Sequence, residues 1–136
     1  GMLARIAEQS RREEEFLAAL AEGGPEAAAA AYASSLADDP PLVPFREDSL
    51  NELAYEALIL DDRPDVAVEL FRLNAEAYPE SWSVHDSLGE GLRAVGRLEE
   101  ALAAYEESVR LEPRHVDGAR CVEELRAELD AGSGGR

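Results

Sequence analysis

The sequence contains no lysine, and its acidic residues far outnumber its basic ones. All 13 basic residues are arginines, and they stand against 30 aspartates and glutamates, which gives a formal net charge of −17. A surface of this charge repels a phosphate backbone or an anionic membrane. We therefore expect no nucleic-acid partner and no membrane partner.

Cysteine and long apolar runs are also nearly absent. A lone Cys121 excludes an internal disulfide and a cysteine-based zinc site within one chain, and it favours a reducing compartment. No apolar run approaches the length needed to span a bilayer, and no apolar region precedes the charged run 8–15. We expect a cytoplasmic protein without a signal peptide, cofactor or metal.

The residues that are abundant favour helix. Alanine, leucine and glutamate dominate, whereas the chain has four Tyr, three Phe and one Trp, and β-branched residues are sparse. The length suits a single domain. The composition therefore predicts an all-α fold.

An internal repeat organises this helical sequence. Segments 65–81 and 99–115 match at a spacing of 34 residues, which is the period of tetratricopeptide repeats. Each unit of that kind is a pair of antiparallel helices, and the pairs stack into a superhelix. The matched positions are Ala67 with Ala101, Phe71 with Tyr105, Asn74 with Ser108, and Pro79 with Pro113.

The matched residue types suit helix packing. Alanine lets a neighbouring helix approach closely, and the aromatic ring one turn later fills the space between units. Proline prevents the second helix from continuing, and Gly96 provides a left-handed residue between two helices. In the first helix of the later unit, one stripe of His85, Leu88, Gly89 and Leu92 is expected to face the partner helix.

We expect one helical domain over residues 1–131, with two clear units at 48–79 and 81–113. Ala54 lies 35 residues before Gly89, so we expect one extra residue in the turn 60–64. A degenerate unit at 3–40 repeats the second-helix pattern with Ala28, Tyr32, Ser35 and Pro40, and we expect the solvated polar run 8–15 to break its first helix. A cap helix over 115–131, with Val116, Val122, Leu125 and Leu129 inward, and a flexible tail over 132–136 complete the prediction.

The repeated segments resemble a known module. Residues 16–113, and most specifically 71–74, 78–81 and 86–90, are similar to the tetratricopeptide module at the C-terminus of bacterial serine hydrolases of the penicillin-binding and esterase types. The resemblance implies a helical interaction or accessory module rather than a catalytic one. No hydrolase domain precedes it here, and Trp82 and His85 depart from the residues expected at those positions.

The stretch His85-Asp86-Ser87 suggests a catalytic triad at first sight. A nucleophilic serine needs a strained turn and an oxyanion hole, whereas Ser87 lies inside a predicted helix. Gly89 and Gly91 follow no strand, which argues against a dinucleotide site. His85 and His115 lack metal-ligand spacing. We therefore expect no enzymatic activity.

The first helices of such units line a groove, so the residues beside the packing stripe are candidates for partner binding. We predict a non-catalytic adaptor whose acidic groove holds a basic or extended peptide segment of a protein partner. The alternatives are a self-associating homodimer module and a detached regulatory piece of a serine hydrolase. The predicted groove residues are Asn51, Tyr55, Leu58, Ser83, Asp86, Glu90 and Arg93.

Overall fold

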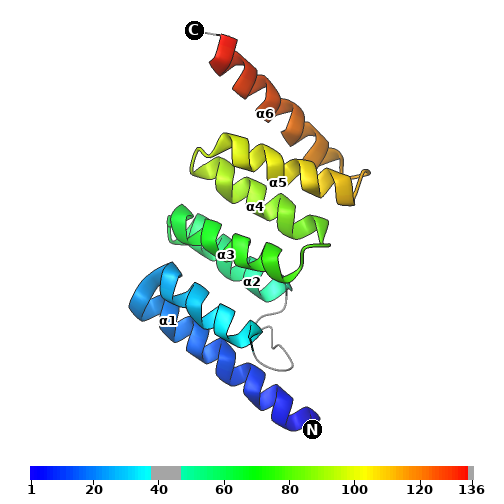
Figure 1. Cartoon of the computed structure of the whole chain (residues 1–136). Coiled ribbons are helices and arrows are strands. Elements are labelled where there is room, and N and C mark those ends of the chain that lie inside the picture. Colours follow the sequence, from blue (N-terminus) through cyan, green and yellow to red (C-terminus); the bar gives the residue numbers. More distant parts are fainter. Residues whose placement is uncertain (38–46, 135–136) are drawn as a thin grey trace.

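The chain forms a stack of helices in chain order, with its two ends at opposite ends of the stack (Figure 1). The computed structural model describes residues 1–37 and 47–134, and no strand occurs within these ranges. None of the described helices is long and apolar enough to cross a bilayer. The helices are α1 (Met2–Leu36), α2 (Glu47–Tyr55), the π-helix η1 (Glu56–Leu60), α3 (Pro64–Ala77), α4 (Trp82–Ala94), α5 (Leu98–Leu111) and α6 (Val116–Gly134).

Element α1 is a helical hairpin. Its backbone leaves the helical region at Gly24, where φ is 76° and ψ is −168°, and the two legs then run antiparallel (Figure 1). Glycine adopts this positive φ at little cost. The chain thus begins with a pair of antiparallel helices.

The polar run 8–15 does not break the first leg of α1, contrary to the prediction. The helix continues through it, since Gly24 is the position where α1 becomes non-helical. Arg11 and Arg12 each pair with both Glu8 and Glu15, at spacings of three or four residues along the helix. Ion pairs at this spacing support a helix whose surface is polar all round.

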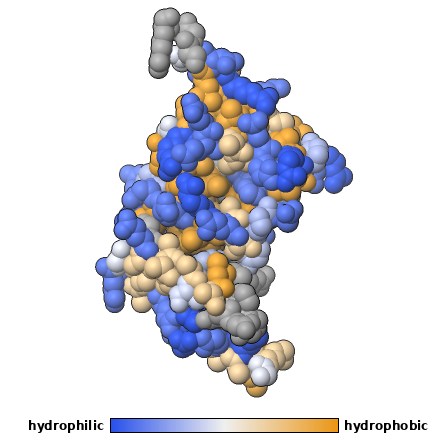
Figure 2. Space-filling model, in the orientation of Figure 1, coloured by the Kyte–Doolittle hydropathy of each residue, from blue (hydrophilic) through white to orange (hydrophobic). Residues whose placement is uncertain are grey.

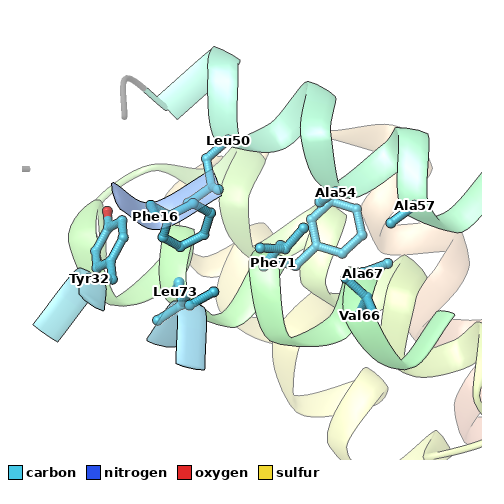
Figure 3. Packing of buried hydrophobic residues seen from close by; sticks show 11 residues of the cluster. Phe16, Tyr32, Leu50, Ala54, Ala57, Val66, Ala67, Phe71 and Leu73 are labelled. Atoms are coloured by element: carbon cyan, nitrogen blue, oxygen red, sulfur yellow. The ribbon is translucent and has the colours of Figure 1, made fainter. Parts of the chain in front are cut away.

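Small residues and aromatic rings hold the next two hairpins together. Ala67 and Ala101 are completely buried, as are Phe71 and Tyr105 to within a few per cent. In Figure 3, Phe71 lies beside Ala54 and Ala67. A Cβ atom added to Gly89 would lie 2.9 Å from the Tyr105 ring. The repeat pattern therefore marks real close contacts between helices.

The degenerate first hairpin contributes an aromatic pair to the core that it shares with α2 and α3. Ala28, Tyr32 and Ser35 are buried, in agreement with the repeat pattern, whereas Pro40 lies outside the described residues. Phe16, which the pattern does not single out, is completely buried and packs edge-on to Tyr32 with ring centroids 5.9 Å apart. Figure 3 shows Phe16 close to Leu50, where this hairpin meets α2.

The extra residue of the earlier unit lies in the helix and not in the turn, where the spacing placed it. Three residues join η1 to α3 and three join α4 to α5, so the two turns are equal in length. The π-helix η1 accommodates the additional residue, and the Asp61 N–H donates to the Glu56 carbonyl over 3.1 Å. A single π turn widens a helix by one residue without changing the connection that follows.

The cap helix α6 differs from the prediction at both ends. Val116 is 76% exposed, because the buried stripe runs through Gly118, Val122 and Leu125, and Val116 lies two residues off it. Residues 132–134 continue the helix, and the flexibility of the tail 132–136, which lies partly outside the described residues, stays a prediction. Once a helix is nucleated, each further residue adds a hydrogen bond, so glycine near its end is tolerated. The division of the chain into units at 3–40, 48–79 and 81–113 stays a prediction.

Replacement of Gly89 by alanine should destabilise the fold. The added methyl group overlaps the Tyr105 ring, and overpacking of this kind costs about 1–3 kcal/mol. This exceeds the roughly 1 kcal/mol that alanine gains over glycine in a helix. Urea unfolding should show a lower free energy of unfolding for Gly89→Ala than for the unchanged protein. The control Gly132→Ala, where nothing lies within 4 Å, should show no loss; equal losses in both variants would contradict the packing account.

Asp62 and Gly96 occupy equivalent turns, with φ of 50° and 79°. A left-handed conformation costs a residue with a Cβ about 1–2 kcal/mol, and less for aspartate. Asp62→Gly should therefore raise the free energy of unfolding by about 0.5–1 kcal/mol, and Gly96→Asp should lower it by about 1 kcal/mol. Thermal melts of the two variants test this. A change of the same sign in both would contradict it.

Candidate functional site

The seven predicted groove residues lie on consecutive first helices of neighbouring hairpins. Asn51 and Tyr55 are on α2, Leu58 is on η1, and the other four are on α4. Positions 83, 86, 90 and 93 are three or four residues apart, so they share one face of α4. Glu90 is exposed and the other six are half-buried. The structure thus brings the predicted residues onto adjoining helices.

Tyr55 connects α2 to α4 across this face. Its hydroxyl donates to Glu90 Oε2 over 2.6 Å and lies 3.3 Å from Ser87 Oγ, while its ring packs edge-on against Phe71 at 4.9 Å. Burial, and next the hydrogen bond to Glu90, raise the pKa of Tyr55 far above its usual value. Tyr55 therefore stays neutral and acts as a hydrogen-bond donor at ordinary pH.

Asp86 contacts the residue that precedes the cap helix. The His115 Nε2–H donates to Asp86 Oδ1 over 3.0 Å, and the His115 ring packs in a tilted arrangement against Trp82, with centroids 4.5 Å apart. The neighbouring His85 instead donates from Nε2 to the Pro79 carbonyl over 2.9 Å. The adjacent His85 and Asp86 thus have different partners and different roles.

Arg93 fixes the other end of the α4 face to α6. Its two terminal nitrogens lie 3.1 Å from Glu124 Oε2 and 2.8 Å from Glu128 Oε1. Among the predicted groove residues, Tyr55 and Glu90 therefore join two neighbouring hairpins, whereas Asp86 and Arg93 join α4 to the cap helix and the residue before it. The sequence pattern does not show these partners.

A polar pocket opens between the beginnings of α2 and α4. It has a volume of about 460 Å³ and is lined by Glu47, Asp48, Asn51, Tyr78 and Ser83. Of these, sequence reasoning identified Asn51 and Ser83. The missed residues are Glu47 and Asp48 in the first turn of α2, and Tyr78, which follows α3. Helical periodicity identifies the faces of helices and gives little information about their ends. The acidic first turn of α2 is a sequence signal that could have identified Glu47 and Asp48.

Hydrogen bonds hold the pocket wall in place. The Ser81 hydroxyl donates to Glu47 Oε1 over 2.6 Å, and the buried Asn74 amide donates to the Glu47 carbonyl over 3.0 Å. Asp48 accepts the Ser49 backbone N–H at 2.9 Å. In the described part of the chain, no three histidine, cysteine or carboxylate side chains are grouped to hold a metal ion. The pocket is an open depression lined by polar residues, and its charge comes from carboxylates.

Comparison with solved structures identifies the architecture. A point mutant of MamA superposes with a TM-score of 0.65 at 23% identity, covering 88% of this chain and 83% of that chain. The Sgt2 TPR domain from Aspergillus fumigatus superposes with a TM-score of 0.60 at 19% identity, covering 93% and 82%. The fold is tetratricopeptide-like. This confirms the predicted all-α fold class; no protein-family model and no curated protein matches the sequence.

The contact between Tyr55 and Glu90 should stabilise the packing of α2 on α4. Tyr55→Phe keeps the ring against Phe71 and removes the hydroxyl, and Glu90→Ala removes its acceptor. Each variant should lose about 0.5–1.5 kcal/mol of stability. In a double-mutant cycle by urea unfolding, the loss in the double variant should be smaller than the sum of the two single losses by at least about 0.5 kcal/mol. Strictly additive losses would show that the hydrogen bond contributes nothing.

Proposed function

We propose that this chain is a non-catalytic adaptor that binds a basic, extended segment of a partner protein on the face formed by α2 and α4. The observation that carries the proposal is the polar pocket, an open depression of about 460 Å³ that is lined by residues carrying two carboxylates, an amide and two hydroxyl groups. Such a set accepts hydrogen bonds from cationic side chains and from peptide N–H groups. The tetratricopeptide-like fold is consistent with a protein partner.

The charge of the face determines which partner it suits. Glu47, Asp48, Asp86 and Glu90 contribute four carboxylates, whereas Arg93 is already paired with two glutamates of α6. The surrounding protein has a net charge of −17, which strengthens the attraction for a cation. Complementary charge steers association and selects against acidic competitors. A basic segment is therefore the proposed guest.

The contacts within the face indicate which groups would bind the guest backbone. Tyr55 and Glu90 already bond to each other, and Asp86 accepts from His115. Asn51 and Ser83 line the pocket, and an amide together with a hydroxyl can both donate to and accept from an extended peptide. We propose that Asn51 and Ser83 bind the backbone, and that the carboxylates bind the basic side chains.

Neutralising the pocket should weaken binding of a basic peptide. Hexalysine serves as the probe, at physiological salt, in isothermal titration calorimetry. Glu47→Gln/Asp48→Asn removes two charges while preserving side-chain shape, and the affinity should fall by about three- to tenfold, as expected for two partly exposed charges. The matched control Glu99→Gln/Glu100→Gln removes two first-turn carboxylates from α5 and should leave the affinity nearly unchanged.

Equal weakening in both double variants would mean that hexalysine responds to net charge alone, and would contradict the assigned site.

Self-association is the second proposal, and one observation favours it: Met2, Leu3 and Ile6 on α1 are 55–78% exposed. The tip of α1 in Figure 2 accordingly shows apolar colours. A molecular mass in solution that doubles as the protein concentration rises, measured in the same samples without peptide, would support self-association. The link to a serine hydrolase rests on the sequence resemblance.

A further inference from the structure

The one tryptophan of the chain is held at the edge of the proposed binding face. Trp82 is the first residue of α4 and stays 39% exposed, although the His115 ring packs against it with centroids 4.5 Å apart and ring planes tilted by 45°. Tryptophan is the side chain most enriched among residues that dominate binding energy at interfaces. A partly exposed, large aromatic surface beside a polar pocket is thus suited to contact a guest.

The position of the Trp82 ring is set before any guest arrives. The His115 ring is fixed by its hydrogen bond to Asp86, and its side chain is only 14% exposed. The His115 backbone is held too, because its N–H donates to the Glu112 carbonyl and its carbonyl accepts from Ala119. A guest that stacks on Trp82 therefore orders little additional structure, which favours binding.

Trp82 lies close in the chain to both the pocket and a carboxylate. Ser83, the next residue, lines the pocket, and Asp86 is one helical turn further on the same side of α4. His115 contacts both Trp82 and Asp86, so these three side chains form one cluster. A cation resting on the indole would be near the Asp86 carboxylate.

We propose that Trp82 is a specificity-determining residue that selects arginine over lysine in the basic guest segment. This inference rests on the proposed function and adds a side-chain preference to it. A guanidinium group is planar and weakly hydrated, so it stacks on an indole ring, whereas an ammonium group holds its water more strongly. Carboxylates attract both cations and already favour a guanidinium through bidentate hydrogen bonds, and the aromatic surface adds a further preference for arginine.

Hexa-arginine and hexalysine, compared by calorimetry on the full chain, test the preference. The intact protein should bind hexa-arginine about two- to fivefold more tightly, which is the ratio expected for a cation–π contact at an exposed site. Trp82→Leu should lower the affinity for hexa-arginine more than the affinity for hexalysine, and so reduce the ratio by about two- to fivefold. Circular dichroism melts of this variant establish that it remains folded.

A second measurement needs no variant. Trp82 is the only tryptophan, and neither peptide contains an aromatic residue, so the indole fluorescence reports contact at this residue directly. Saturating hexa-arginine should change the emission. Equal affinity for both peptides, or unchanged emission at saturation, would overturn the role of Trp82 while leaving the groove proposal standing. Binding of neither peptide would overturn both.

Discussion

Close approach between helices at small residues is the constraint on which the rest of the structure depends. Gly89 leaves room for the Tyr105 ring, and Gly91 leaves room for Phe71, whose Cδ2 would lie 2.8 Å from an added Cβ. Because each aromatic ring fills the space left by a glycine, the helices of one hairpin and of its neighbour are fixed at short distance. This spacing places α2 beside α4 and allows Tyr55 to reach Glu90.

Periodicity in the sequence predicts this packing well and its local adjustments poorly. The 34-residue spacing correctly identifies buried positions such as Ala67, Phe71 and Tyr105. It also reveals one extra residue, but spacing alone cannot distinguish a longer turn from the π turn of η1, since both restore the register. Composition likewise suggested a break at 8–15, where arginine and glutamate pairs within one helix keep it continuous.

The candidate site was predictable to the level of the helix face. Helical spacing picks out Ser83, Asp86, Glu90 and Arg93 on α4. The partners of the last three come from α2, from the residue before α6 and from α6, so they could not be read from one segment. His115 lies 29 residues from Asp86, and Glu128 lies 35 from Arg93. The pocket wall was missed for a similar reason, because Glu47 and Tyr78 belong to helix ends. Long-range contacts of this kind require the fold.

The central claim is that the face of α2 and α4 binds a basic segment, and two-dimensional amide NMR tests it most directly. Hexa-arginine is added to isotopically labelled protein, and the shifted resonances are mapped onto the structure. The account predicts that the largest shifts cluster on Asn51, Ser83 and the single indole N–H of Trp82. Shifts concentrated on the second helices α3 and α5, or no shifts at saturating peptide, would contradict it.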